Sequence, residues 1–410
     1  MAVTSVPRQQ TEAAQPERPR HSAWAFDYWL ALVAGALLVF GLLVVFSTTF
    51  PWSLSSHGDT TSIFLQQVQW LAIGLVVVVV LLRFDYSILR GLSLPVMGLT
   101  IVALLAVLIV GQVVFGARRG LFNGSVQPGE LAKLATIIYL AHWLSTKGDK
   151  LRSLKFGLAP YMVVVGVVAG LIFAQPDLST ALLIVLTAAT MFFVAGADLR
   201  QLGIGLLVAA ALFLIVIPRL PYAQERIKEW ESALADPLNA DWHERQVMIA
   251  LGSGGTTGVG LGIGRQKWGV LPTPHTDSVF AVIGEELGLL GTLAVLALFG
   301  CLVVRGFQIA RNARDEFGFA LGVGVTCSLA YEALINMTVM TGIFPFTGVP
   351  LPFMSYGGSS LLVTMASVGI LLSISRGSFK SPKAKVRLTR AHHDGGRWNG
   401  GARLPRTRGR

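Results

Sequence analysis

Charged side chains are scarce in this 410-residue sequence, in which Asp, Glu, Lys and Arg together make up only 13% of the residues. Soluble globular domains usually carry about twice that fraction. Apolar residues account for 53% of the chain. This composition excludes an ordinary soluble enzyme and indicates an integral membrane protein.

Cysteine is also scarce, with only Cys301 and Cys327, and both lie in apolar runs. Two such residues provide neither a disulfide framework nor a thiolate metal site. We expect both to be core residues. His142 has no second metal-binding residue at i+4, so we expect a packed or interfacial histidine there rather than a ligand.

Negative charge is rare in the C-terminal tail, which concentrates the basicity of the chain. The net charge is +11, and residues 376–410 hold eleven Lys and Arg against one Asp, so ten of the net charges lie there. We interpret 377–410 as a disordered basic cytoplasmic tail that lies against anionic lipid. A nucleic-acid partner is not expected.

The N-terminal residues 1–23 lack the apolar core of a cleavable signal peptide and are rich in Gln, Pro, Glu and Arg. We predict a disordered cytoplasmic tail there. A membrane domain over 24–376 then begins with a retained span.

Ten apolar runs follow, and nine of them are long enough to cross about 30 Å of hydrocarbon. The fourth is shorter and carries Glu130 and Lys133. The sequence predicts an all-α polytopic membrane protein with about ten transmembrane helices, at 28–48, 66–83, 92–115, 130–144, 156–175, 178–197, 202–218, 289–307, 319–343 and 359–375.

Lys and Arg gather in alternate short loops, which places both termini in the cytoplasm. The one large loop, 219–276 between spans 7 and 8, is then extracytoplasmic. Its Tyr222–Leu234 portion has the spacing of an interfacial amphipathic helix. Its Gly252–Gly264 portion is a weak match to a phosphate-binding loop, and we expect only flexible backbone near a ligand.

Asp277 follows this loop at the outer end of an apolar run, and small residues succeed it at helical steps of 4, 3, 4 and 3. On a continuous helix these residues share one face. In one interpretation Asp277 is an N-cap and the small residues admit a neighbouring helix. In the other, an acid stands above a groove for a long lipid ligand, with the groove formed by Ala281, Gly284, Gly288 and Gly291.

Other polar residues lie inside the spans, where their burial costs free energy, so they are usually paired or functional. Glu130 and Lys133 stand at i, i+3, which predicts an ion pair and leaves room for a substrate role. Glu332 and Asn336 share a helix face, and we expect interhelical hydrogen bonds from them. Asp177 fits an N-cap.

Several separated motifs together resemble the SEDS family of FtsW, RodA and SpoVE, slightly more FtsW than RodA. The resemblance covers about 28–376. The motifs are Gln127-Pro-Gly-Glu-Leu-Ala-Lys133, Gln175-Pro-Asp-Leu-Ser-Thr180, Gly252-Ser-Gly-Gly255, His275-Thr-Asp277, Ile283-Gly-Glu-Glu-Leu-Gly288 and Pro350-Leu-Pro-Phe-Met-Ser-Tyr-Gly-Gly-Ser-Ser360.

This resemblance implies a multi-pass enzyme of the cytoplasmic membrane, a peptidoglycan glycosyltransferase that polymerises lipid II at the outer face with a class B penicillin-binding transpeptidase. It implies that Asp277 is catalytic and that Glu130 and Lys133 affect activity and activation. Further candidates for sugar or diphosphate binding in the motifs are His275, Thr276, Ser355 and Ser359. The family usually has Trp directly after the two arginines, Arg118 and Arg119, whereas this sequence has Gly120 there.

The chemistry of glycan extension can be stated from first principles. A sugar hydroxyl must lose its proton to a general base as it attacks an anomeric carbon, and cations must neutralise the departing diphosphate. Asp277 can be the base. The candidate cations are Arg118, Arg119, Lys133, Arg265 and Lys267.

No cofactor is indicated, although a divalent cation such as Mg or Mn could share the neutralising role. A flippase of lipid-linked cell-wall precursor and a membrane scaffold are the alternatives. A flippase should carry ionisable groups near the midplane. The ionisable residues of this chain concentrate at the outer helix ends, which favours the enzyme.

Overall fold

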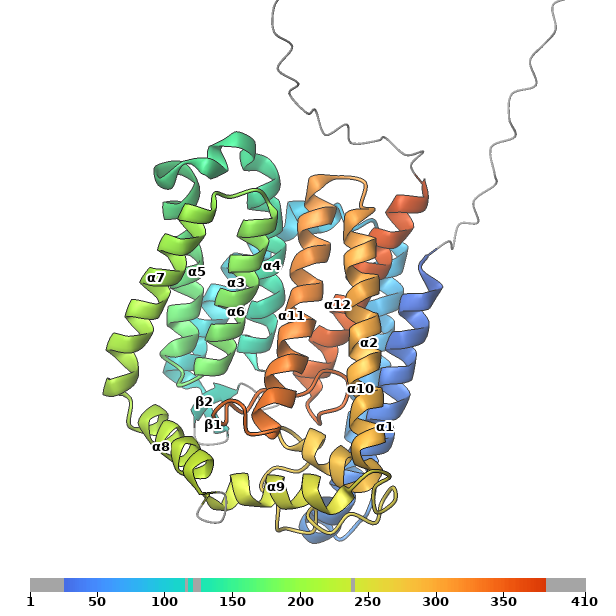
Figure 1. Cartoon of the computed structure of the whole chain (residues 1–410). Helices are drawn as coiled ribbons and strands as arrows, with labels where there is room; N and C mark the ends of the chain where they lie inside the picture. Colours follow the sequence, from blue (N-terminus) through green and yellow to red (C-terminus); the bar gives the residue numbers. More distant parts are fainter. Residues whose placement is uncertain (1–25, 115–116, 121–126, 237–239, 381–410) are drawn as a thin grey trace, which may run out of the picture.

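The computed structural model describes residues 26–114, 117–120, 127–236 and 240–380. Ten long helices run side by side between two ends of the molecule (Figure 1). They correspond one by one to the ten predicted apolar runs: α1 Tyr28–His57, α2 Ser62–Arg83, α3 Ile88–Val110, α4 Pro128–Lys147, α5 Ala159–Phe173, α6 Leu178–Val194, α7 Leu199–Val216, α10 Val279–Arg311, α11 Glu316–Met340 and α12 Gly358–Lys380.

Seven helical segments of the described residues are long and apolar enough to cross a membrane by length and composition. They are α1, α2, α3, α10, α11, α12 and the segment Leu154–Phe173, which joins α5 to the helical turn before it. The helices α6 and α7 count as shorter apolar segments, and α4 carries Glu130, Lys133 and Lys147. The protein is therefore a multi-pass membrane protein. The number of ten spans stays a prediction.

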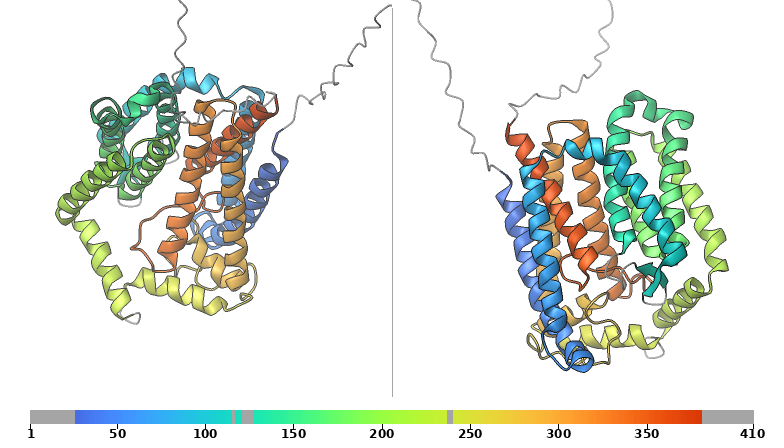
Figure 2. Two further views of the ribbon diagram at one scale, coloured as in Figure 1. Left: turned by 45° about the horizontal axis from the view of Figure 1, so that its top comes forward. Right: turned by 180° about the vertical axis from the view of Figure 1, so that it is seen from behind.

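The helix α1 begins, and α12 ends, at one end of the bundle, drawn uppermost in Figure 1. Two further helices, α8 Pro221–Ala235 and α9 Trp242–Gly254, lie across the opposite end, as the two views of Figure 2 confirm. The predicted helix over Tyr222–Leu234 is thus confirmed as α8. Which end faces the cytoplasm stays a prediction, and the tails at 1–23 and 381–410 lie outside the described residues.

A short antiparallel hairpin follows α3 within the otherwise helical fold, and the sequence did not predict it. It consists of β1 Gln112–Val114 and β2 Ala117–Gly120. The predicted span to residue 115 ends at Val110, because Gly111 adopts an extended conformation with φ −64° and ψ 142°. Val113 and Val114 are β-branched, which suits a strand better than a helix end.

The helices α11 and α12 form the centre of the bundle. The most apolar 18-residue stretch of α11 is 72% buried within the protein and that of α12 is 78% buried, against 11% for α2. The helix α11 contacts α4, α6, α10 and α12. Polar groups on α11 are therefore surrounded by protein and need partners there.

The helices α5, α6 and α7 line an open cavity of about 330 Å³. Almost all of its lining is apolar, including Val165, Leu182, Phe192 and Leu206, and Gln201 lies at its edge. Glycines at Gly166, Gly170 and Gly205 leave space where side chains would otherwise fill the gap between these helices.

Candidate active site

Asp277 lies in the turn that leads into α10 and is partly buried. The amides of Thr276 and Ser278 donate to the Thr273 carbonyl at 3.2 and 3.3 Å, so the turn closes before the helix starts. Ser278, not Asp277, occupies the N-cap position. The capping interpretation of Asp277 is therefore wrong, whereas Asp177 does cap α6, because its side chain accepts a hydrogen bond from the Thr180 amide.

The turn is fixed from outside by α11 and by the segment that precedes α12. Asn336 Nδ2 donates to the Asp277 carbonyl at 2.8 Å and to the Val349 carbonyl at 2.7 Å. Ser355 Oγ donates to the Thr276 carbonyl at 2.6 Å. Both side chains thus bond to backbone groups and fix the position from which the Asp277 carboxylate projects.

A glycine stands opposite the carboxylate. Gly348 has φ +68°, and a Cβ placed there would lie 3.3 Å from Asp277 Oδ2. Both the left-handed backbone and the close approach favour glycine at this position. The adjacent Thr347 carbonyl accepts a hydrogen bond from Ser179 Oγ on α6, which ties this side of the site to α6.

A buried ion-pair cluster forms at the start of α4. Lys133 Nζ lies 2.9 Å from Glu130 Oε2 and 2.6 Å from Glu332 Oε1, and all three side chains are at least 93% buried. The predicted pair of Glu130 and Lys133 is confirmed. Glu332 extends it across to α11, so the predicted interhelical bonding is confirmed for Glu332. Asn336 bonds instead to two backbone carbonyls outside the helices. Removing Lys133 would leave two buried carboxylates without their cation.

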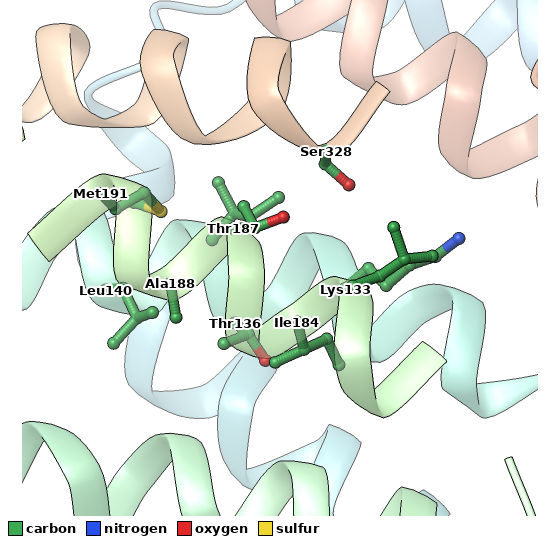
Figure 3. Close-up of a pocket in the computed structure, with 10 residues that line it drawn as sticks. Lys133, Thr136, Leu140, Ile184, Thr187, Ala188, Met191 and Ser328 are labelled. Carbon is green, nitrogen blue, oxygen red and sulfur yellow. The ribbon is translucent and has the colours of Figure 1, made fainter. Parts of the chain in front are cut away.

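Because Glu332 and Asn336 are one turn apart on α11, a single buried helix contacts both the Lys133 cluster and the Asp277 turn. Beneath Lys133 a narrow cavity of about 10 Å³ lies along α4 and α6. Figure 3 shows Lys133 at one end of it and Met191 at the other. Thr136 Oγ1 is buried there with no hydrogen-bond partner, so the cavity is partly polar.

The glycine-rich stretch after α9 binds carboxylates of its own chain. Glu285 Oε1 accepts from the Arg265 amide at 2.7 Å, and Glu286 Oε2 accepts from the Gly262 amide at 3.0 Å. The expectation of flexible backbone beside a ligand is therefore wrong here, because these amides are already hydrogen-bonded to α10. The resemblance to an anion-binding loop reflects an internal anion.

Lys267 is not placed to bind a diphosphate, so this prediction is wrong. Its ammonium is 3% exposed and lies 2.7 Å from both Glu286 Oε1 and Ser47 Oγ. Arg265 is exposed at the surface. Arg118 and Arg119 belong to β2, and their side chains lie outside the described residues.

The row of small residues after Asp277 is not one continuous face. Gly288 has φ +65° and ψ −163°, which breaks the helical path inside α10. Ala281, Gly284 and Gly288 are buried. A Cβ on Gly284 would lie 2.3 Å from Leu251 of α9, and a Cβ on Gly288 would lie 2.4 Å from the Gly258 amide in the loop after α9. Of the two alternatives, close packing against a neighbouring helix is confirmed for Gly284, and Gly291 lies beyond the break.

The other motif residues surround the turn. The His275 ring stacks on Trp52 with centroids 4.2 Å apart, and burial lowers the pKa of His275 to about 4. Thr276 is 9% exposed, and Ser359 is 8% exposed in the first turn of α12. Ser355 also accepts from the Leu351 amide at 2.7 Å, so its hydroxyl is fully engaged within the protein.

The arrangement offers a partly exposed carboxylate on a rigid turn, and α11 connects this turn to the buried ion-pair cluster of Lys133. Such a carboxylate can accept a proton from an approaching hydroxyl. Trp52 was missed from the sequence because it lies in a loop beyond the predicted first span and belongs to no motif. The isolated pair of Glu332 and Asn336 in a long apolar helix was the signal that could have linked α11 to the site.

Comparisons with known proteins agree with this geometry. Residues 28–380 match a family described as cell cycle protein, that of FtsW, RodA and SpoVE. A protein of Trichlorobacter lovleyi named probable peptidoglycan glycosyltransferase FtsW is 38% identical over 364 residues, covering 87% of this chain and 95% of its own. Stage V sporulation protein E of Bacillus subtilis is 37% identical, with 85% and 97% covered.

Two solved structures resemble the fold. A chain from a peptidoglycan synthase complex that coordinates polymerization and crosslinking has a TM-score of 0.72 and 29% identity, covering 87% of this chain and 99% of its own. The rod shape determining protein RodA of Thermus thermophilus has a TM-score of 0.65 and 28% identity, with the same coverage.

Proposed function

The chain belongs to the cell cycle protein family of FtsW, RodA and SpoVE, and we propose that it is a peptidoglycan glycosyltransferase that polymerises lipid II with Asp277 as general base. The reaction takes place at the outer face of the cytoplasmic membrane. Each cycle joins a sugar hydroxyl to the anomeric carbon of a second lipid-linked saccharide and releases a lipid diphosphate.

The single observation that carries the assignment to Asp277 is its position: a partly exposed carboxylate on a turn whose backbone is held by Asn336 and by Ser355. A general base must keep its place while the substrate arrives, because small misplacements reduce the rate. The carboxylate accepts the hydroxyl proton as the glycosidic bond forms. Proton transfer of this kind is worth a factor of about 10² to 10⁴.

Lys133 supports this chemistry by electrostatics. Its ammonium is fixed between Glu130 and Glu332, and α11 connects that cluster to the Asp277 turn. A change in the cluster therefore alters both the local charge and the position of α11. Cations at the surface, Arg265 among them, remain candidates for the leaving diphosphate.

The distribution of charge disfavours the flippase. Among the described helices, Glu130, Lys133 and Glu332 lie within about 12 Å of the helix end next to the Asp277 turn, from 1.5 Å of rise per residue. Asp27 and Arg305 pair at the other end. No Asp, Glu, Lys or Arg of these helices lies between the two groups, where a transport path would need one.

The partner we propose is a class B penicillin-binding transpeptidase, supported by the similarity to a chain of a peptidoglycan synthase complex. Both termini are cytoplasmic in this proposal, and residues 219–276 are outside. Mg or Mn is a variable of the assay, since the described residues contain no group of three or more His, Cys, Asp and Glu that could hold a metal.

The test is purified protein in detergent or liposomes, alone and with its cognate transpeptidase, incubated with lipid II. We expect glycan polymer from the wild type and almost none from Asp277→Asn. Translocation of a fluorescent lipid II analogue is measured in parallel. Translocation without polymer, with and without the transpeptidase, would favour the flippase instead.

A further inference from the structure

Three aromatic rings from distant parts of the chain meet beside the Asp277 turn. Trp52 lies near the end of α1, His275 in the turn before α10, and Tyr356 in the segment before α12. The centroids of Trp52 and His275 are 4.2 Å apart at an interplanar angle of 15°. Tyr356 stands edge-on to both, at 5.9 Å and 6.1 Å.

This aromatic cluster reaches the surface and combines ring faces with polar groups. Trp52 is 38% exposed, whereas His275 is 9% exposed beneath it. The Tyr356 hydroxyl donates to Gln66 Oε1 on α2 at 2.6 Å, at an exposed position. The Tyr356 amide donates to the His275 carbonyl at 2.7 Å, which holds the segment against the turn.

Anchoring in the membrane interface suits an exposed tryptophan at this level, but it does not account for the buried His275 on which Trp52 stacks. From Tyr28 to Trp52 the helix α1 rises about 36 Å, more than the roughly 30 Å of hydrocarbon. Trp52 therefore stands beyond the apolar layer, at the level of the turn. His275 Nδ1 is buried without a hydrogen-bond partner, and a buried polar atom in that state calls for a ligand or a water molecule.

We propose that Trp52, His275 and Tyr356 form a subsite for a chain of β-linked amino sugars. The apolar C–H faces of pyranose rings pack on aromatic rings, while hydroxyl and amide groups satisfy the hydroxyls and N-acetyl groups. His275 and Asp277 are two residues apart, so their Cα atoms are separated by at most about 7 Å. A sugar in the subsite is then a neighbour of the reacting sugar.

This inference rests on the proposed function and assigns a place to its substrate. Two sources supply the same chemistry, the growing glycan strand and the saccharide of the incoming lipid. We assign the subsite to the growing strand. The subsite lies outside the hydrocarbon layer, so it can hold sugars of the strand that are far from any attached lipid.

The experiment compares Trp52→Ala, Trp52→Phe and Tyr356→Phe with the wild type. Trp268→Ala is the matched control. Trp268 is an exposed tryptophan in the loop between α9 and α10, which also contains His275, and its ring packs on Phe50. One measurement is saturation-transfer NMR with a soluble GlcNAc–MurNAc tetrasaccharide. The other is the length distribution of glycan made from lipid II, with thermal unfolding to verify that each variant folds.

We expect Trp52→Ala to bind the tetrasaccharide about tenfold more weakly, as for the loss of one stacking contact, and to make shorter strands. Trp52→Phe should retain most of both properties, Tyr356→Phe should lose part of the binding, and Trp268→Ala should match the wild type. An increase in the KM for lipid II with unchanged tetrasaccharide binding would overturn the assignment to the growing strand in favour of the lipid-linked sugar.

Tetrasaccharide binding, strand length and KM that are all unchanged in Trp52→Ala would overturn the subsite. If Trp52→Ala does not fold, Tyr356→Phe alone decides, and wild-type behaviour in both measurements overturns the subsite. The NMR arm needs no turnover. A wild type that makes no polymer therefore contradicts the proposed function, whereas a wild type that polymerises and does not bind the tetrasaccharide contradicts only the subsite.

Discussion

The same segment of the chain carries two kinds of carboxylate, and their surroundings differ. Glu286, on α10, is 2% exposed and bonds to Lys267, to Ser47 and to a loop amide. Asp277, nine residues earlier, is partly exposed on a turn that is held through its backbone. The carboxylate oxygens of Glu286 bond to buried partners and stabilise the fold, whereas Asp277 is partly exposed, where a substrate can approach it.

The sharpest way to break this comparison is to remove each negative charge with its isosteric amide. We expect Asp277→Asn to lower polymerisation of lipid II by a factor of about 10² to 10⁴, with thermal stability close to that of the wild type. Glu286→Gln should show the opposite division, lower stability with normal turnover per folded molecule.

Initial rates and thermal unfolding in one detergent measure both effects. Near-normal turnover in Asp277→Asn would place the general base elsewhere in the protein. A Glu286→Gln variant that is fully stable but inactive would exchange the two roles.

The pair of Lys267 and Glu286 offers a second test, on stability alone. Lys267→Met leaves Glu286 as an unpaired buried charge, which costs about 3–5 kcal/mol. The double variant Lys267→Met/Glu286→Leu removes both charges and should recover most of that loss, since an apolar pair of similar volume is often tolerated. Equal losses in the single and double variants would show that packing, not charge, holds this contact.

Two glycines of α9 allow a matched comparison of packing against α10. A Cβ on Gly254 would lie 1.9 Å from the Gly284 carbonyl oxygen, whereas a Cβ on Gly252 would meet nothing within 4 Å. We expect Gly254→Ala to cost about 3 kcal/mol of stability through overpacking. Gly252→Ala should be neutral or slightly stabilising, because alanine favours the helix. Similar melting temperatures for the two variants would contradict the close approach of α9 and α10.

The smallest effect concerns pH. Burial lowers the pKa of His275 to about 4 from its usual 6.5, so between these values the unfolded chain binds more protons and stability falls as pH falls. This contribution amounts to about 2 kcal/mol between pH 7.5 and pH 5. His243 acts in the same direction, and Glu244, whose pKa burial raises to about 7, acts in the opposite one.

The difference between wild type and His275→Phe cancels those other groups. We expect the unfolding free energy of His275→Phe to depend less steeply on pH between 5 and 7.5. Parallel curves for the two proteins would mean that His275 is not held neutral by burial.

The sequence predicted local features well. Hydrophobic runs placed all ten long helices, and the i, i+3 spacing found the pair of Glu130 and Lys133. Residues far apart in sequence were beyond its reach, because nothing in a spacing pattern reveals that Glu332 approaches Lys133 or that Ser47 approaches Lys267.

The errors share a physical cause. Periodicity arguments assume a continuous helix, and Gly288 breaks it with a left-handed φ that only its missing side chain permits readily. A charged residue in a loop also reads as exposed, yet the turn after α9 folds Lys267 inward onto Glu286. The role of Asp277 came from the family motif, and the structure added the contacts of its backbone.

The apolar cavity between α5, α6 and α7 has a practical consequence for handling the purified protein. A cavity of about 330 Å³ with an apolar lining is unfavourable to leave filled with water. In a bilayer, lipid acyl chains can occupy this cavity. In detergent solution, the alkyl tails of the detergent must fill it instead. The alkyl chain length of the detergent used for extraction should therefore decide whether α7 stays packed against α5 and α6.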